Sequence, residues 1–237
     1  MSRDPKKINS FVIIDVETGG LDKKDGNHAQ KVAVTEIAML AMNGVTLQDI
    51  VKYDNLIKPY DSTLIYDPQA AQVTGIDKGL CEREGVRLRE VVDDMIIVLE
   101  EANIHQTKTA KPIFVAHNWP FDRGFVMEMF RRAGKDLSKY VQGGKDCFGN
   151  FIPQGIDTID LAKQCWADIT DNTTKFKLGA CCLKAGVEFS DAHRAMNDVL
   201  PTADLFRYFM TRLRSGSSEV TVREGGNISV VRKSFEW

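Results

Sequence analysis

The hydrophobic positions of this chain form β-like runs near the N-terminus and helical repeats further on. Residues 11–14, Phe-Val-Ile-Ile, are a β-branched apolar run that ends in turn-forming residues, which predicts a buried strand. Residues 32–42 and 51–57 have the same character, with an Asn-Gly pair at 43–44 as the turn between them. Three consecutive strands with short links predict an antiparallel meander.

From residue 87 onward, apolar residues recur every three or four positions, as they do on the buried face of a helix. The predicted helices cover residues 87–102, 121–133, 159–166, 177–185 and 196–213, and short strands over 112–116 and 156–158 lie between them. Pro201 predicts that the last helix either begins near Asp198 or kinks there. The alternation predicts an α/β domain with a mixed five-stranded sheet flanked by helices.

The C-terminal residues have a different pattern. After the Ser- and Gly-rich stretch at 215–218, two β-branched runs at 220–222 and 228–231 flank Gly-Gly-Asn, which predicts a β-hairpin. An isolated hairpin is only marginally stable, so we expect it to dock on the body or on a partner. We therefore divide the chain into a domain over 1–215 and a C-terminal hairpin and tail over 216–237.

Composition narrows the class of protein. The 237 residues include 31 Lys and Arg against 33 Asp and Glu, with 43% hydrophobic and 27% charged residues. This excludes a disordered chain, and no apolar run reaches the ~20 residues that span a bilayer, so we expect a cytoplasmic protein. A net charge of -2 also argues against a protein that coats nucleic acid through bulk electrostatics. A nucleic-acid substrate would need a local site, with metal ions carrying the positive charge.

The cysteines agree with a reducing compartment. They are odd in number and contain no C-x-x-C pair, which argues against a disulfide framework and a zinc site. We expect buried, reduced thiols. The five are Cys81, Cys147, Cys165, Cys181 and Cys182.

Candidate chemistry begins with carboxylates at predicted strand ends. Asp15 and Glu17 are two apart at the end of the first strand, so both side chains point to one face. Two such carboxylates repel each other unless a cation lies between them. Asp122 follows the strand at 112–116 and opens a helix, where open α/β sheets gather their sites. The alternatives are a solvated strand end and an ordinary acidic residue at a helix N-terminus.

His193 and Asp198 complete this set at the start of the last helix. Alone, the histidine could equally be a surface residue. Together, four carboxylates and an imidazole suit phosphodiester hydrolysis assisted by two divalent ions. Oxygen ligands favour Mg²⁺, with Mn²⁺ as a substitute, and a neutral histidine would take the proton of the attacking water.

At these positions the sequence resembles the DnaQ-like DEDD exonucleases of the histidine subtype, which have a ribonuclease H-like fold. The three family motifs are matched in order by residues 14–18, 117–122 and 193–202. Weaker matches lie at 73–76 and 157–162. The resemblance covers about residues 8–214.

The resemblance implies a 3′→5′ exonuclease that releases nucleoside 5′-monophosphates from single-stranded DNA or RNA ends. By carry-over, His193 is the general base, although His117 also precedes an Asp by five residues, so spacing alone does not choose between them. The implied metal ligands for two ions are Asp15, Glu17, Asp122 and Asp198. The implied substrate-binding residues are Thr18, Leu21, His117, Asn118 and Phe121, with Leu21 as an apolar wedge beside the last base.

The chain also departs from the family. Its first motif ends in Gly-Gly, as in ribonuclease T, but most base-stacking aromatics of that enzyme are replaced, and the matching positions are Leu21, Val73 and Pro153. Because aromatic stacking contributes ~1–3 kcal/mol per base, we expect a less selective grip on the terminus. A Trp-Pro pair at 119–120 inside the second motif is unusual and is expected to shape the pocket. Arg123 and Arg194 are the candidate phosphate contacts.

Three functions remain open at this point. The first is a stand-alone exonuclease on single-stranded ends. The second is a proofreading subunit bound to a DNA polymerase, with the C-terminal hairpin as the contact with that partner or with a second copy in a homodimer. The third is a nucleic-acid-binding scaffold without catalysis, although a pure binder would gain nothing from clustered like charges. The preference for DNA or RNA cannot be determined from the sequence.

Overall fold

A computed structural model describes most of the chain. The described residues are 9–21, 28–104, 110–166, 176–190, 193–215, 217–224 and 227–234. Among the helices within these ranges, none is long and apolar enough to cross a membrane.

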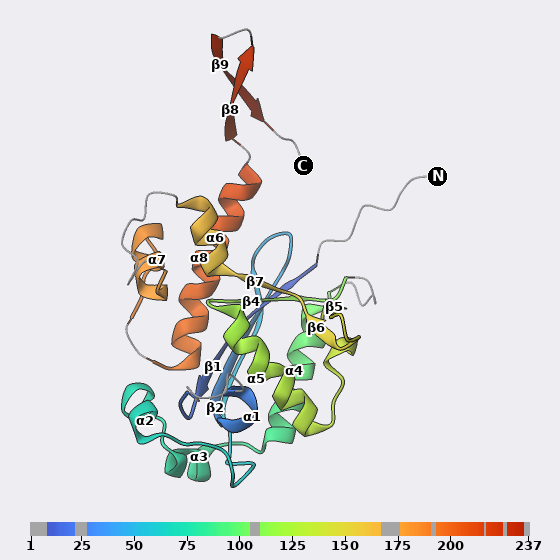
Figure 1. Cartoon of the computed structure of the whole chain (residues 1–237), viewed down its shortest axis with the longest axis vertical. Helices are drawn as coiled ribbons and strands as arrows, with labels where there is room; N and C mark the ends of the chain where they lie inside the picture. Colours follow the sequence, from blue (N-terminus) through green and yellow to red (C-terminus); the bar gives the residue numbers. More distant parts are fainter. Residues whose placement is uncertain are drawn as a thin grey trace.

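The centre of the molecule is a mixed five-stranded sheet, as predicted (Figure 1). Its strands are β1 (Phe11–Thr18), β2 (Val34–Met42), β3 (Asp49–Leu56), β4 (Ile113–Ala116) and β7 (Gly155–Asp157), in the order β3-β2-β1-β4-β7. The first three strands pair antiparallel, which confirms the meander. The β1–β4 and β4–β7 pairs are parallel. Because β1 is central, its end is surrounded by loops and helices from several parts of the chain.

Helices cover both faces of the sheet (Figure 1). Helices α4 (Leu88–Ala102) and α5 (Trp119–Ala133) pack on one face, and α8 (Ala195–Ser215) packs on the other. Helices α6 (Thr158–Cys165) and α7 (Leu178–Ala185) lie against α8. These five helices begin within about two residues of the predicted positions.

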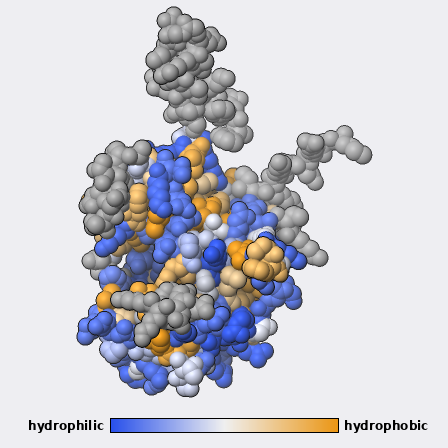
Figure 2. All heavy atoms as spheres, in the orientation of Figure 1, coloured by the Kyte–Doolittle hydropathy of each residue, from blue (hydrophilic) through white to orange (hydrophobic). Residues whose placement is uncertain are grey.

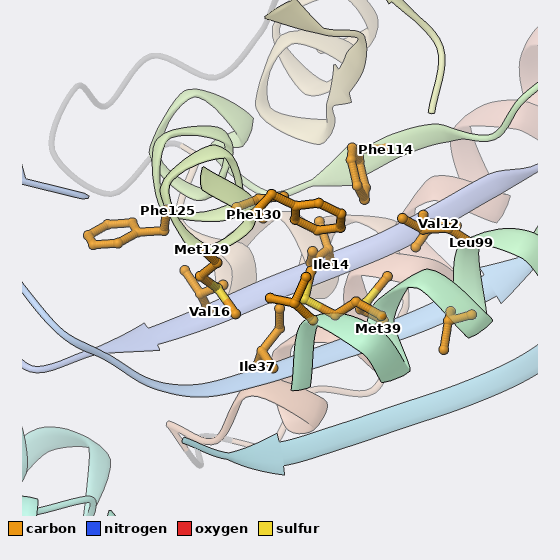
Figure 3. Close-up of a cluster of buried hydrophobic side chains, with 14 of the residues drawn as sticks. Val12, Ile14, Val16, Ile37, Met39, Leu99, Phe114, Phe125, Met129 and Phe130 are labelled. Atoms are coloured by element: carbon orange, nitrogen blue, oxygen red, sulfur yellow. The ribbon is translucent and has the colours of Figure 1, made fainter. Parts of the chain in front are cut away.

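The alternation of side chains along β1 divides the core into two layers. Val12, Ile14 and Val16 point toward α4 and α5, where they meet Phe114 and Phe125 among others (Figure 3). The intervening residues point toward α8 and join a second cluster, made by Phe11, Ile13, Ala38, Leu40, Met42, Val115, Ala195, Val199, Ala203 and Phe206. Successive strand residues alternate between faces, so Asp15 and Glu17 continue the row of Phe11 and Ile13 on the α8 side.

Helix α8 excludes one of the two alternatives that Pro201 set. It begins at Ala195 and runs through Pro201, so it does not begin near Asp198, and the kink stays a prediction. Proline lacks an N–H and would leave the carbonyl of Asn197, four residues earlier, without its helical partner. The first turn is held from outside the helix instead, because the N–H of Ala195 donates to Glu36 of β2. Tertiary packing therefore starts the helix before the proline.

Several short elements were not predicted. They are α1 (His28–Lys31), α2 (Pro68–Thr74), α3 (Lys78–Glu84), a 3₁₀ turn over Leu137–Lys139, β5 (Gly143–Lys145) and β6 (Phe151–Pro153). Local capping defines α2 and α3, because Asp67 and Asp77 accept N–H groups of their first turns. Gly75 ends α2 with a φ of 72°, which glycine adopts without strain.

The C-terminal hairpin is confirmed as a pair of strands. β8 (Ser217–Glu224) and β9 (Asn227–Ser234) pair antiparallel over eight residues each. The turn at 225–226 lies outside the described residues. The docking of the hairpin, and the division into 1–215 and 216–237, stay predictions.

All five cysteines are thiols without a disulfide. Cys81, Cys181 and Cys182 are buried, as expected, and burial raises the pKa of each. The expectation of buried thiols is wrong for Cys147 and Cys165, which are exposed.

Candidate active site

The end of β1 is open on the side of β4. β4 pairs with β1 only at Phe11, Val12 and Ile13, so in the described part of the chain no strand pairs with the last five residues of β1 on that side. Asp15 and Glu17 lie in this stretch and are partly buried. The sheet thus places both carboxylates at an edge that other elements can approach.

Asp122 reaches this edge from α5. β4 ends at Ala116 and α5 starts at Trp119, which brings the first turn of the helix beside β1. The N–H of Val16 donates to Oδ1 of Asp122 over 3.1 Å, and Asp122 is only 2% exposed. A solvated helix-terminal acid is therefore excluded for Asp122.

Asp198 approaches from the opposite layer. It lies in the first turn of α8, and it forms an acidic group with Asp15 and Glu17 in which one oxygen from each residue lies within 4.8 Å of the others. Asp122 is outside this group of three but close enough to act electrostatically on Asp15. The structure therefore brings together all four acids that the motifs predict, three of them tightly.

The electrostatics of this group are unfavourable without a cation. Burial, followed by repulsion from Asp122, Glu17 and Asp198, raises the pKa of Asp15 well above its usual range. Burial also raises the pKa of Glu17 to about 7, and the charges of Asp198 and Glu36 add to this. The pKa of Asp122 is raised by burial, against the hydrogen bond from Val16. An all-oxygen cluster of excess negative charge fits a hard divalent cation.

The two candidate histidines have different environments. His193 is exposed, two residues before α8. The ring of His117 instead bonds at both nitrogens, with Nδ1 2.8 Å from Oγ1 of Thr158 and Nε2 2.6 Å from the carbonyl oxygen of Phe176. A carbonyl only accepts, so Nε2 carries the proton and Nδ1 accepts from Thr158. Burial lowers the pKa of His117. Both arguments favour His193 as the general base.

Asn118 and Thr18 are held by local hydrogen bonds. Asn118 precedes α5 in a left-handed conformation with φ 78°, and its N–H donates to Asp157. A non-glycine residue in this region is strained, which often accompanies a functional position. The Thr18 hydroxyl donates to the carbonyl of Gly20 over 3.0 Å. Leu21 is 55% exposed, as a wedge against a base requires.

Aromatic residues near the second motif belong mainly to the core. Phe121 is partly buried, with its ring centroid 5.0 Å from that of Phe125. Trp119 is buried and packs 5.1 Å from Phe114, so it supports α5 from below. The expectation that the Trp-Pro pair at 119–120 shapes the pocket stays a prediction. Of the positions where ribonuclease T has stacking aromatics, Val73 is exposed on α2 and Pro153 is buried in β6.

A pocket of about 530 Å³ adjoins the end of β1. It lies between the first motif and the helices α2 and α3. Its lining residues are Gly19, Tyr66, Asp67, Pro68, Ala71, Gln72, Gly75, Ile76, Asp77, Lys78 and Gly79. The Gly19 carbonyl accepts from the N–H of Asp67, which ties the pocket wall to the strand that carries Asp15 and Glu17.

Sequence reasoning missed Glu36. It lies on β2 directly opposite Glu17 and is 2% exposed. Its carboxylate accepts hydrogen bonds from Arg194 and from the N–H of Ala195. The structure thus pairs Arg194 with Glu36 rather than leaving it as a simple phosphate contact. The only sequence signal was a charged residue inside the apolar run at 34–42.

The fold class follows from the likeness to solved structures. The chain superposes on E. coli exonuclease I, in its complex with a dT13 oligonucleotide, with a TM-score of 0.66. The two sequences are 18% identical, and the superposition covers 89% of this chain and 44% of exonuclease I. The zinc-bound form of the exonuclease I–ssDNA complex gives a TM-score of 0.66 at 20% identity, covering 87% and 41%. The chain thus spans less than half of exonuclease I. The fold is the ribonuclease H-like α/β fold, as expected.

The family follows from sequence comparison. The exonuclease family model matches residues 12–206. Ribonuclease T of Shewanella sp. (strain MR-4) is 30% identical over 224 residues, which cover 89% of this chain and 90% of that protein. Ribonuclease T of Haemophilus influenzae (strain PittEE) is 29% identical over 209 residues, covering 86% and 80%. The chain belongs to this exonuclease family, and it is a 3′→5′ exonuclease, a phosphodiester hydrolase. The family depends on divalent metal, and the acidic group at the end of β1 is a possible site for it.

Proposed function

We propose that this exonuclease degrades single-stranded nucleic acid from the 3′ end and releases nucleoside 5′-monophosphates. The observation that carries the proposal is the acidic group of Asp15, Glu17 and Asp198, with Asp122 beside it. These residues would hold two Mg²⁺ ions, and Mn²⁺ would substitute. Both ions prefer carboxylate oxygens, which are the ligands that this cluster offers.

The bound ions would supply activation of the attacking water and stabilisation of the departing oxygen. The protein residues have separate tasks. His193 would accept the proton of the attacking water, because it is exposed and a neutral imidazole is a proton acceptor. Asp122 also fixes the end of β1 through the N–H of Val16, which keeps Asp15 and Glu17 aligned.

The end of the substrate would lie over the first motif. The pocket beside Gly19 offers room for the terminal nucleotide, and Leu21 and Val73 expose apolar surface in the same part of the chain. Exonuclease I has been crystallised with single-stranded oligonucleotides, and the ribonuclease T relatives are named as ribonucleases, so both DNA and RNA ends are candidate substrates. Aliphatic residues stack less strongly than aromatic ones, which favours weak base selectivity.

A degradation time course tests this proposal. 5′-labelled single-stranded DNA and RNA of matched sequence would be incubated with the protein in Mg²⁺, in Mn²⁺ and in EDTA. We expect a metal-dependent ladder that shortens from the 3′ end, and release of 5′-monophosphates by chromatography. Asp15→Asn should abolish the ladder, whereas Asp160→Asn, at an exposed carboxylate on α6, should not.

Two results would contradict the proposal. Tight binding of either strand with no cleavage by the intact protein would support a scaffold. Cleavage that persists in EDTA or in Asp15→Asn would assign the reaction to other residues.

A further inference from the structure

Among the described residues, the side chain before α8 does not cap the helix. Helix N-termini are normally capped by a Ser, Thr, Asp or Asn side chain, but Arg194 precedes α8 and its side chain has no acceptor atom. The acceptor comes instead from β2, where Oε2 of Glu36 lies 2.8 Å from the N–H of Ala195. The carboxylate that caps α8 is therefore 159 residues away in sequence.

The same carboxylate binds the residue before the helix. Nε of Arg194 lies 2.9 and 3.1 Å from the two oxygens of Glu36, and Nη2 lies 2.5 Å from Oε1. The Glu36 side chain is 2% exposed and that of Arg194 is 48% exposed. A buried carboxylate with both oxygens bound to protein donors is a structural anchor, and loss of its partner leaves a buried charge.

This anchor lies between the two layers that supply the acidic group. Glu36 is the direct cross-strand neighbour of Glu17, at the point where the β1–β2 register shifts. Its hydrogen bonds reach residues 194 and 195, and Asp198 follows one helical turn later. The position of Asp198 relative to Asp15 and Glu17 therefore depends on the contact of Glu36 with residues 194 and 195. None of the three acids takes part in this contact.

We propose that Glu36 is a positioning residue that sets the distance between Asp198 on α8 and the two acids on β1, and that it acts through Arg194 and the N–H of Ala195 rather than by binding metal. This inference rests on the proposed function of the acidic group. Glu36 holds the first turn of α8 in place, and Arg194 adds a positive charge to a region with five carboxylates.

The test compares Glu36→Gln, Arg194→Gln, the double variant and a matched control. Glutamine at 36 still accepts from the N–H of Ala195 but loses the ion pair with Arg194. The control is Arg207→Gln, which breaks an ion pair between the same helix and Asp49, away from the acidic group. Three quantities would be measured for each variant. Mn²⁺ affinity would come from titration, and kcat and KM from cleavage of a single-stranded oligonucleotide. Amide hydrogen exchange over residues 193–199 would be followed without metal.

We expect each single variant at the anchor to lower Mn²⁺ affinity or kcat ~10–100-fold, with KM little changed. Loss of a residue that orients the ligands of a metal typically has an effect of this size. The double variant should cost little more than either single one, because both break one contact. Hydrogen exchange over residues 193–199 should rise in these variants and not in Arg207→Gln.

The inference is overturned by either of two results. One is unchanged exchange and unchanged Mn²⁺ affinity in a folded Glu36→Gln protein. The other is loss of one bound Mn²⁺ in Glu36→Gln but not in Arg194→Gln, which would make Glu36 a ligand. Because hydrogen exchange is measured without metal or substrate, it decides the positioning role even if the wild-type protein fails to cleave. Arg194→Gln supplies the same comparison if Glu36→Gln does not fold.

Discussion

Burial and mutual repulsion act on the same carboxylates at the end of β1. The pKa values of Asp15 and Asp122 rise well above their usual range, and that of Glu17 rises to about 7. Each shift marks a carboxylate whose charged form is less stable in the folded chain than in water. At the residue scale, the cluster therefore destabilises the folded protein without metal, and a bound divalent cation would offset this cost.

The first prediction concerns the pH dependence of stability. The pKa of Glu17 is about 7 in the folded chain against an ordinary 4.5. Between these values the folded protein holds a proton that the unfolded protein releases, so stability from this group is present below pH 4.5 and is lost as pH rises toward 7. Without metal, we expect the Tm of the wild type to fall relative to that of Glu17→Gln over this pH window. The corresponding loss in the free energy of unfolding is at most about 3 kcal/mol.

Thermal unfolding in EDTA from pH 4 to pH 8 measures this difference. Mg²⁺ added at pH 8 should then raise the Tm of the wild type more than that of Glu17→Gln. A difference between the two proteins that stays constant across the pH range would refute the assignment of the shift to Glu17.

The second prediction separates the two histidines. His193→Ala should lower kcat by ~10²–10⁴, the usual contribution of a general base, with Tm nearly unchanged because the residue is exposed. His117→Ala should lower the free energy of unfolding by about 2–3 kcal/mol, because it leaves the Phe176 carbonyl without its donor and removes one of the two partners of the Thr158 hydroxyl. Steady-state kinetics and thermal unfolding of both variants provide the measurement. The reverse pattern would make His117 the base.

The sequence was sufficient to find the four acids and both histidines, because each occurs in a motif with fixed spacing. Spacing alone could not choose between His117 and His193, and only the resemblance to the family favoured His193. The partners that distinguish His117 are 41 and 59 residues away from it. Glu36 was missed for the same reason: its role depends on Arg194, 158 residues later. Residues whose function is set by distant hydrogen bonds leave almost no local signal.

At the scale of elements, glycine lets β7 and α5 approach each other. A Cβ on Gly155 would lie 2.2 Å from Nε1 of Trp119, so only glycine leaves room for this indole at the first position of α5. The indole also packs on Phe114. Asp122 lies in the same first turn of α5 as Trp119. The position of Asp122 therefore depends on Gly155 of β7.

The third prediction follows from this contact. Gly155→Ala should lower the free energy of unfolding by ~1–3 kcal/mol through overpacking, and it should lower kcat because the start of α5 shifts with Asp122. Gly144→Ala is the matched control, since a Cβ there meets nothing within 4 Å. Thermal unfolding and kinetics of the pair give the result. Equal stability of the two variants would exclude the crowding argument.

The long elements were predictable because their apolar period is strong. The helices α4 to α8 and the strands β1, β2 and β4 contribute buried residues to the hydrophobic clusters. The short helices α2 and α3 were missed because they bury little: the former has no buried residue and the latter only Cys81. Their ends are fixed by capping at Asp67, Asp77 and Gly75. These residue types indicate a turn in the sequence and do not contribute to an apolar helical repeat.

At the scale of the whole molecule, the charge balance does not favour binding of nucleic acid through bulk electrostatics. The net charge is -2, and the face shown in Figure 2 is mostly hydrophilic with apolar patches between polar ones. Arg194, one of the two candidate phosphate contacts, is engaged with Glu36. Affinity for nucleic acid should therefore depend strongly on the metal.

The fourth prediction concerns the C-terminal hairpin. The family match ends at residue 206, before β8 begins at Ser217. Deletion of residues 216–237 should leave Tm and the rate on single-stranded ends unchanged. Kinetics, thermal unfolding and gel filtration of the truncated protein test this.

Any partner contact of the hairpin should disappear in the same truncation. A polymerase that co-purifies with the full chain but not with the truncated one would support the proofreading alternative, and a change in mass from dimer to monomer would support a homodimer. A large loss of nuclease rate in the monomeric truncated protein would instead make the hairpin part of the substrate site.

The anchoring of α8 on β2 has a consequence for biosynthesis. Asp15, Glu17 and Glu36 are synthesised before Arg194, Ala195 and Asp198, and the acidic group forms only when these later residues dock. A nascent chain that has not yet reached Asp198 therefore lacks a complete acidic group at the end of β1.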